Sequence, residues 1–257
     1  MERPAPRCST RQIKTKHCTS PSSLATAAPQ RLSRVSIIVQ AGNWQVLFFA
    51  VIRSKGFRVY ASVRKEADAA RLQKHFGTER FTPLLFDITD EDAAFLPLLG
   101  TDKSLTGPPG RLIQLSSVLG EAEMPYQAVY CASKHGLEAV TACLRRELDP
   151  YHIKVVTIRP GSTTSDFWGK TDWTTHDGGP WEKGMKTAHA LVDLTLKRPT
   201  SCKAVAQTAL RAVTASRPRI VYYTVGSWDQ WLGIKMIGSW LPLWLVDLFW
   251  LVGLRNL

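Results

Sequence analysis

The chain contains 257 residues, of which 44% are hydrophobic and 21% are charged, and its formal net charge at pH 7 is +12. This hydrophobic fraction excludes an intrinsically disordered protein, and the length suits one α/β domain with appended segments. The excess positive charge is not gathered in one patch of the sequence, so it does not indicate a nucleic-acid-binding protein.

Residues 1–34 have a composition of their own. They hold seven arginines and lysines against one acidic residue, Glu2, and are rich in Ser, Thr and Pro. Such a segment buries too little apolar surface to fold by itself. Basic, hydroxyl-rich leaders are typical of organelle transit peptides, and a disordered tail is an equally good interpretation. The expected location is an organelle (mitochondrion or plastid) or the cytoplasm.

The cysteines and histidines indicate neither a disulfide framework nor a metal site. There are five cysteines, an odd number, and no Cys-x-x-Cys pair among them. The six histidines are scattered along the chain. Reduced thiols therefore fit best, and no metal ligand is assigned.

Strands alternate with helices along most of the sequence. Short runs rich in Val, Ile and Leu predict buried strands, and Gly56 and Gly77 mark two helix ends. The predicted strands are 34–40, 57–64, 81–87, 110–117 and 153–161, and the predicted helices are 44–55, 65–77 and 127–148. This alternation favours an α/β fold with a doubly wound parallel sheet.

Three residues near the middle of the chain have the spacing of a proton-transfer site. Tyr130 and Lys134 are four residues apart in a predicted helix and therefore share one face. A neighbouring ammonium can lower the pKa of a phenol, ordinarily about 10, by roughly 1 to 3 units, which suits general acid or base catalysis on an alcohol and its carbonyl. Ser117, at the end of a predicted strand, could hydrogen-bond the same substrate oxygen. We expect Ser117, Tyr130 and Lys134 to be catalytic.

These residues resemble the short-chain dehydrogenase/reductase family. Ser117, Tyr130-Cys-Ala-Ser-Lys134 and Arg159-Pro160-Gly161 match its catalytic serine, its Tyr-x-x-x-Lys motif and its Pro-Gly pair, at the family's spacing. The resemblance covers about residues 35–226 and implies a Rossmann-like fold. It also implies that Tyr130 donates or accepts the proton, that Lys134 lowers the pKa of Tyr130 and binds the nicotinamide ribose, and that Ser117 orients the substrate.

The resemblance further implies a nicotinamide cofactor, with Gly42, Arg64, Lys65, Asp87, Lys134, Pro160, Gly161 and Ser165 in its site. Arg64 and Lys65 stand at the tip of the predicted second strand, where basic side chains suit a 2′-phosphate. NADP(H) is therefore favoured over NAD(H), and a solvated charge pair is the alternative. Asp87 stands where the family contacts adenine, and the alternative is an N-cap of the following helix.

The chain departs from the family at two places that both concern the cofactor. The family carries a glycine-rich motif that lets the backbone approach the pyrophosphate, whereas residues 41–48 read AGNWQVLF and keep only Gly42. Between Asp87 and Ser117, one central strand and its helix, with two functional asparagines, are missing. That helix usually contributes to the dimer interface, so the sequence argues against a homo-oligomer of the usual kind.

The last third of the chain is rich in tryptophan. Residues 162–184 stand where the family places a mobile substrate loop, and Trp168, Trp173 and Trp181 could line a pocket or simply pack. Residues 227–257 end in an apolar run, 240–254, that is shorter than the roughly 20 residues of a membrane span. An interfacial anchor and burial against the domain are equally good interpretations. The resemblance of this tail to that of steroid- and retinoid-converting members favours membrane association and a lipophilic substrate.

The sequence thus predicts a leader (1–34), a catalytic domain (35–226) and a C-terminal segment (227–257). The favoured function is an NAD(P)(H)-dependent oxidoreductase that interconverts an alcohol and its carbonyl. The alternative is a pseudoenzyme or truncated isoform that acts as a membrane-associated binding protein. The three catalytic residues favour the first function, and the incomplete cofactor motifs favour the second.

Overall fold

The computed structural model describes residues 57, 59–63, 65–79, 81–85, 97–101, 109–163, 179 and 181–255. All of them belong to one compact unit, Leu32–Leu257. The predicted leader, the first predicted strand (34–40) and the first predicted helix (44–55) lie outside the described residues.

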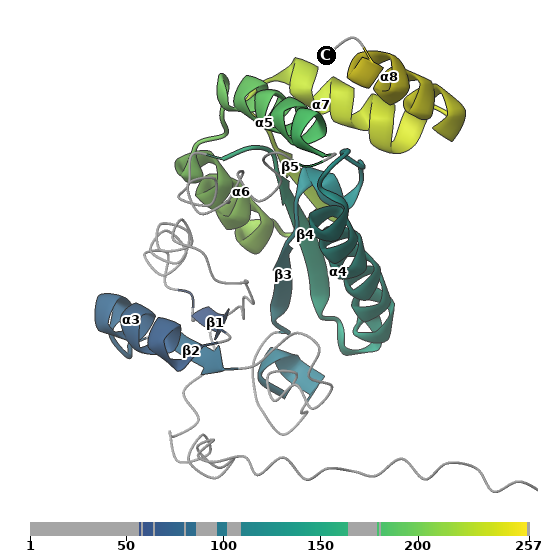
Figure 1. Ribbon diagram of the computed structural model, residues 1–257. Coiled ribbons are helices and arrows are strands. Elements are labelled where there is room, and N and C mark those ends of the chain that lie inside the picture. The colour runs from purple at the N-terminus through teal and green to yellow at the C-terminus, as the bar shows by residue number, and fades with distance from the viewer. Residues whose placement is uncertain are drawn as a thin grey trace, which may run out of the picture. The chain divides into compact units, whose positions relative to one another are not determined.

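Within these described residues, five strands form two parallel sheets (Figure 1). The first sheet pairs β1 (Val59–Val63) with β2 (Phe81–Leu85). The second has the order β3 (Arg111–Leu115), β4 (Lys154–Pro160) and β5 (Val221–Thr224). The four predicted strands that fall on these residues are confirmed. In the described residues between β2 and β3, namely 97–101 and 109–110, there is no strand.

The helices that matter for the site follow the strands in the expected α/β order. The helices are α3 (Glu66–Phe76), α4 (Ala128–Glu147), α5 (Glu182–Leu196), α6 (Cys202–Thr214), α7 (Trp228–Lys235) and α8 (Leu243–Arg255). Shorter helical turns are η1 (Pro97–Thr101), η2 (Val118–Gly120), η3 (Asp149–Tyr151) and η5 (Met236–Trp240). The predicted helices 65–77 and 127–148 are confirmed as α3 and α4, whereas α5, α6 and β5 were not predicted.

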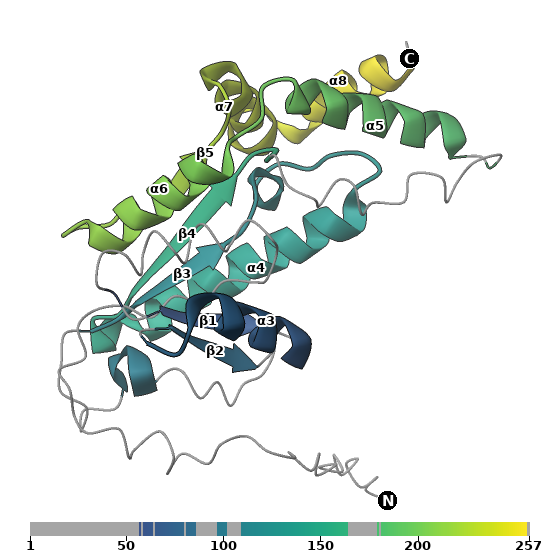
Figure 2. The ribbon, with the colours of Figure 1, turned by 90° about the vertical axis from the view of Figure 1, so that its left-hand side faces the viewer.

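Helices α4 and α6 cover opposite faces of the three-stranded sheet (Figures 1 and 2). Successive strand residues point to opposite faces. Val156 and Ile158 of β4 pack with Ala209 of α6, whereas Val155 packs with Leu148, directly after α4. Chain direction then places the start of α4 near the carboxyl ends of β3 and β4, because α4 follows β3 through η2.

Apolar packing joins the two sheets. One core cluster contains Val59 and Phe81 of the first sheet together with Ile113 and Val156 of the second. Within the described part of the chain, no strand pair connects the two sheets. In the described residues, this apolar cluster therefore holds the two sheets together, whereas backbone hydrogen bonds hold the strands together within each sheet.

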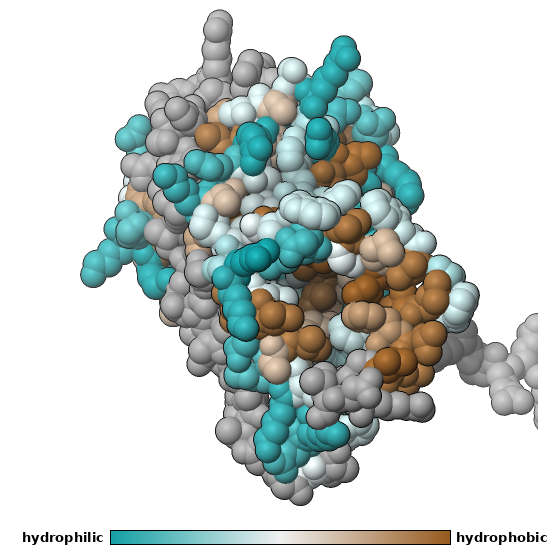
Figure 3. All heavy atoms as spheres, turned by 90° about the horizontal axis from the view of Figure 1, so that it is seen from above, coloured by the Kyte–Doolittle hydropathy of each residue, from teal (hydrophilic) through white to brown (hydrophobic). Residues whose placement is uncertain are grey.

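The C-terminal segment folds into α7, η5 and α8, with Pro242 before α8. Many of its large apolar side chains are exposed, among them Trp240, Leu243, Trp244, Leu248, Phe249, Leu251 and Val252. Seen from above, hydrophobic residues (brown) gather towards the right-hand side of the molecule (Figure 3). Of the helices described, none is long and apolar enough to cross a membrane.

Candidate functional site

Ser117 lies at the carboxyl end of β3, where the chain turns into η2. It is the N-cap residue of η2, and its Oγ accepts a hydrogen bond of 3.2 Å from the backbone N–H of Leu119. Its side chain is buried. The cap fixes the serine at the carboxyl edge of the sheet, which is where ligands bind in open α/β folds.

Tyr130 and Lys134 project from the first turns of α4 towards this serine. The Tyr130 phenol lies close enough to Ser117 for the serine side chain to lower its pKa. The Lys134 ammonium lies 5.7 Å from the centre of the Tyr130 ring, within range of a cation–π interaction. The structure therefore brings together the three residues predicted to be catalytic.

Burial dominates the proton affinities of this pair. It raises the pKa of Tyr130, although the Ser117 side chain acts in the opposite direction. It lowers the pKa of Lys134, although the Glu138 carboxylate opposes this. The predicted lowering of the pKa of Tyr130 is therefore wrong, because desolvation of the phenolate is the largest effect on it. Tyr130 is a neutral phenol at pH 7 and can donate a proton.

Gly120 permits the close approach of η2 and α4 on which this geometry depends. A Cβ atom at position 120 would lie 2.7 Å from the Ser116 Oγ, 3.0 Å from the Glu138 Cγ and 3.2 Å from the Lys134 carbonyl oxygen. These distances are shorter than ordinary van der Waals contacts. A side chain here would push the Lys134 turn away from Ser117.

The predicted cofactor residues fall into two groups. Pro160 ends β4, and the N–H of Gly161 donates a 2.8 Å hydrogen bond to the Thr224 carbonyl, so both lie at the carboxyl edge next to Ser117 in sheet order. Lys65 is exposed at the N-cap of α3, directly beyond β1. The other four, Gly42, Arg64, Asp87 and Ser165, lie outside the described residues.

One of the three loop tryptophans is described. Trp181 is 60% exposed at the start of α5, and its ring makes an edge contact with Tyr126, with 6.5 Å between ring centroids. Trp168 and Trp173 lie outside the described residues. The Tyr126 ring also rests on Gly184, where a Cβ would lie 2.1 Å from the ring. This contact connects the approach to α4 with α5.

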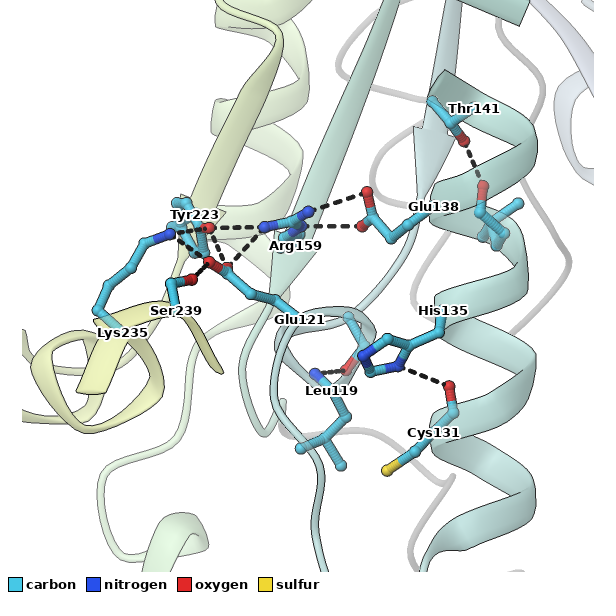
Figure 4. A network of polar contacts seen from close by, with 12 residues as sticks. Leu119, Glu121, Cys131, His135, Glu138, Thr141, Arg159, Tyr223, Lys235 and Ser239 are labelled. Carbon is cyan, nitrogen blue, oxygen red and sulfur yellow. Dashed lines mark hydrogen bonds and ion pairs between the residues drawn. The ribbon is translucent and has the colours of Figure 1, made fainter. Parts of the chain in front are cut away.

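An ionic network with little solvent exposure lies between α4, β4 and the C-terminal segment (Figure 4). Arg159 of β4 binds Glu138 through two hydrogen bonds, of 2.9 and 3.0 Å, and binds Glu121 at 2.6 Å. Lys235 and Ser239 from the C-terminal segment bind Glu121, as does the Tyr223 hydroxyl. The charged side chains are 11–18% exposed.

Contacts within the network shift the pKa values of Glu121 and Arg159 in the direction that favours their charged forms. Burial alone would raise the pKa of Glu121, but hydrogen bonds from Lys235, Ser239 and Tyr223 and the charge of Arg159 lower it to about 2. For Arg159, burial is likewise outweighed by Glu138, so its pKa is raised. The pKa of Lys235 is also raised, so Glu121, Arg159 and Lys235 are ionised at neutral pH.

The sequence carries one local signal of this network, which was not predicted. Glu138 lies four residues after Lys134 and therefore on the helix face that carries Tyr130. Its partner Arg159 lies 21 residues further on, and Glu121 and Lys235 are separated by 114. Contacts over such separations follow from the fold and not from any local pattern.

Known proteins resemble the part of the chain that holds this site. A model of the short chain dehydrogenase family matches residues 93–175. Over 130 residues the chain is 34% identical to the NADPH-dependent 3-dehydrocapnine reductase of Ornithobacterium rhinotracheale, covering 49% of this chain and 44% of that protein. It is 32% identical over 123 residues to mouse mitochondrial D-beta-hydroxybutyrate dehydrogenase, covering 48% and 31%. It is 36% identical over 87 residues to mouse estradiol 17-beta-dehydrogenase 2, covering 34% and 21%.

The fold also resembles solved structures. A short-chain dehydrogenase from Streptomyces avermitilis superposes with a TM-score of 0.58 at 15% sequence identity, covering 78% of this chain and 91% of that one. The curated relatives are matched over less than half of their own length. The part of the chain that holds Ser117, Tyr130 and Lys134 therefore resembles the short-chain dehydrogenase/reductase family in sequence, and the described fold resembles that of a solved short-chain dehydrogenase.

Proposed function

We propose that this protein is an oxidoreductase that interconverts an alcohol and its carbonyl compound with NADP(H). One observation carries the proposal, namely the juxtaposition of Ser117 with the Tyr130 phenol, with the Lys134 ammonium beside the phenol ring. Two hydroxyl groups that meet beside a cation form a site for a single substrate oxygen.

Each of the three residues has a distinct part. Ser117, fixed by its cap to η2, would donate a hydrogen bond to the substrate oxygen and orient it. Tyr130 would transfer the proton at its Oη, as the acid in carbonyl reduction and as the base in alcohol oxidation. Lys134 would stabilise the phenolate that remains after proton donation. Burial of the pair keeps water from competing for these bonds.

The described residues fit the nicotinamide end of the cofactor. Lys134 offers an ammonium that makes no ion pair with a described residue, and Pro160 ends the strand next to β3 in sheet order, with Gly161 directly after it. When bound, the cofactor supplies or accepts the hydride at the carbonyl carbon. Lys134 would hold its ribose, and the Pro160-Gly161 turn would border the nicotinamide. The remaining assignments, Gly42, Asp87 and Ser165, are proposed from the sequence.

NADP(H) is proposed over NAD(H). Lys65 is exposed directly beyond β1, where a basic side chain can reach a 2′-phosphate, and Arg64 precedes it. The relative from Ornithobacterium is named as NADPH-dependent. Both observations support the phosphorylated cofactor.

A lipophilic substrate and attachment to a membrane surface complete the proposal. The exposed apolar residues of η5 and α8 include two tryptophans, which favour the lipid headgroup region. Estradiol 17-beta-dehydrogenase 2, one of the relatives, is named for a steroid. An enzyme attached at the interface would meet such substrates where they are dissolved.

A binding protein without catalytic activity is the second candidate. The departure at residues 41–48, where only Gly42 of the phosphate-binding glycines is present, favours it. Val46 and Phe48 would stand where the backbone must approach a pyrophosphate. Nucleotide binding therefore discriminates between the two candidates.

The first experiment is a titration of the purified chain with NADPH and, separately, with NADH, followed by tryptophan fluorescence. We expect saturable binding of NADPH that weakens at least about tenfold in a Lys65→Ala/Arg64→Ala variant, because each lost phosphate contact costs on the order of 1 kcal/mol. Lys74→Ala, an exposed lysine of the same helix, is the matched control. If a folded chain binds neither nucleotide, the oxidoreductase proposal is wrong and the binding protein is favoured.

A further inference from the structure

Arg159 binds one of two charged groups that share a face of α4. Glu138 lies one helical turn beyond Lys134, at a spacing where glutamate and lysine commonly pair. In the described part of the chain they form no ion pair. Glu138 instead gives both carboxylate oxygens to Arg159, while the Lys134 ammonium lies over the Tyr130 ring.

The two hydrogen bonds between Arg159 and Glu138 explain why Glu138 pairs with Arg159 and not with Lys134. A guanidinium matches a carboxylate with two parallel hydrogen bonds, whereas an ammonium offers a single point charge. Arg159 is itself fixed from the other side by Glu121 at 2.6 Å and by the Tyr223 hydroxyl at 2.7 Å. It therefore cannot turn away without leaving buried carboxylates unpaired.

The C-terminal segment binds Glu121, the carboxylate on the other side of Arg159 from Glu138. Lys235 donates to Glu121 and, at 2.6 Å, to the Tyr223 hydroxyl, and Ser239 donates to Glu121. Gly238 lies against the backbone of Glu121, where a Cβ would be 2.5 Å from its carbonyl oxygen. Residues 235–239 thus pack directly on the carboxylate that fixes Arg159.

We propose that Arg159 is a positioning residue, which holds Glu138 away from Lys134 and so leaves the Lys134 ammonium beside Tyr130. The role of Lys134 in this statement rests on the proposed function. Without Arg159, Glu138 would pair with Lys134 and draw the ammonium along the helix, away from the phenol. The C-terminal segment contributes through Glu121 and is part of the support of the site.

Two groups of its own helix act on Lys134, namely the Tyr130 ring and the Glu138 carboxylate. The other charged groups nearby act on Glu138 or on its partner: Arg145 and Arg159 act on Glu138, and Glu121 binds Arg159. Of these, only Glu138 is an anion within one turn of Lys134. A change in the proton affinity of Lys134 on loss of Arg159 would therefore report on Glu138.

Competitive acetylation tests the proposal without any need for nucleotide binding or turnover. The full chain and its variants are treated with limiting acetic anhydride between about pH 7 and pH 10, and acetylation of each lysine is measured by peptide mass spectrometry, with exposed Lys74 as the internal reference. Only the unprotonated amine reacts. We expect Arg159→Met to slow labelling of Lys134 at least about threefold, since a rise of half a pKa unit lowers the free-amine fraction by about that factor.

Three further variants separate positioning from general damage. Arg159→Met/Glu138→Gln should restore the labelling of Lys134 to the wild-type rate, because the competing anion is gone. Arg159→Lys should retain most of it. Arg198→Met, which removes an exposed ion pair with Asp229, should have no effect. If Arg159→Met does not fold, Arg159→Lys and Arg159→Lys/Glu138→Gln provide the same comparison.

Unchanged labelling of Lys134 in folded Arg159→Met would overturn the proposal. So would a double variant that labels as slowly as Arg159→Met alone. A different outcome separates the two proposals. If the variants label Lys134 as expected but the chain does not bind NADPH, the positioning role stands and the oxidoreductase function is wrong.

Discussion

Arg159 and Glu138 are joined by two hydrogen bonds, from Nε to Oε1 at 2.9 Å and from Nη2 to Oε2 at 3.0 Å, which connect β4 to the middle of α4. Both side chains are 13–14% exposed. The pair lies one turn from Lys134 and is continuous, through Glu121, with Lys235 of the C-terminal segment. The catalytic helix and the C-terminal segment therefore share one set of charges.

Removing Glu121 should destabilise the protein strongly. Glu121→Ala would leave Arg159 and Lys235 short of a partner in a buried site, and breaking a buried ion pair typically costs about 3–5 kcal/mol. Urea unfolding measures this loss. Asp149→Ala is the control, because its ion pair with Lys154 is exposed and such pairs contribute roughly 0–1 kcal/mol. Equal effects of the two substitutions would show that the network does not stabilise the fold.

The network should also set the stability of the protein in acid. The pKa of Glu121 falls from 4.5 to about 2 on folding, so the ionised carboxylate is favoured in the folded state. The resulting stabilisation, roughly 3 kcal/mol, is complete above the unfolded pKa and is lost as the pH falls from 4.5 towards 2. Thermal unfolding of Glu121→Gln should show a weaker pH dependence in this range than that of the wild type. Parallel curves for the two proteins would contradict the assignment.

Gly120→Ala should disturb the site through packing alone. The added methyl group would clash with Ser116, Lys134 and Glu138 at 2.7–3.2 Å, and overpacking of this kind costs about 1–3 kcal/mol. Gly136→Ala is the matched control in α4, since nothing lies within 4 Å of its added Cβ. An alanine inside a helix there should stabilise the protein by roughly 0.5–1 kcal/mol. We therefore expect Gly120→Ala to lower the free energy of unfolding and Gly136→Ala to raise it. If both substitutions lower it by the same amount, η2 and α4 do not approach each other closely.

The raised pKa of Tyr130 predicts an asymmetric dependence on pH. Carbonyl reduction needs the neutral phenol, so its rate should stay level up to about pH 10, the ordinary value for a phenol, and fall only above it. Alcohol oxidation needs the phenolate and should rise with pH over the same range. Initial rates in both directions provide the test. A reduction rate that halves near pH 7 would mean that bound cofactor or substrate lowers the pKa of Tyr130 below the value that burial gives it.

Vesicle binding tests the proposed membrane attachment. Trp244 and Phe249 of α8 are 65% and 57% exposed. Trp244→Glu/Phe249→Glu should reduce flotation with phosphatidylcholine vesicles at least about tenfold, because it removes two large apolar contacts and adds two charges. Ile220→Glu, at a residue that is 54% exposed and lies before β5, should have no effect. Equal flotation of all three proteins would argue that the C-terminal segment is not the attachment site.

Much of the fold could be predicted because its core strands are short apolar runs. The strands 110–117 and 153–161 and the helix 127–148 were placed to within two residues of β3, β4 and α4. Helices α5 and α6 were missed. The apolar face of α6 is regular, but besides Val205 and Val213 it consists mainly of alanine and threonine, so it lacks the large apolar residues that mark the other predicted elements.

The catalytic candidates could be predicted and their proton affinities could not. Helical spacing brings Tyr130 and Lys134 to one face, and the strand end supplies Ser117. Burial depends on which residues cover that face, and it reverses the expected direction of the Tyr130 pKa. In the same way, the pairing of Glu121 with Lys235 requires the C-terminal segment to return to η2, which no local pattern encodes.

The most direct test of the account is hydride transfer from NADPH deuterated at C4 of the nicotinamide to a panel that contains a steroid ketone, a long-chain aldehyde and an aromatic ketone. We expect deuterium in the alcohol product of at least one compound with the wild-type chain and with Tyr151→Phe, an exposed control. With Tyr130→Phe, transfer should fall about 10²–10⁴-fold while NADPH binding persists. If the wild-type chain binds NADPH and transfers no deuterium, or if Tyr130→Phe transfers it as fast as the wild type, the Ser117, Tyr130 and Lys134 site does not perform the proposed reaction.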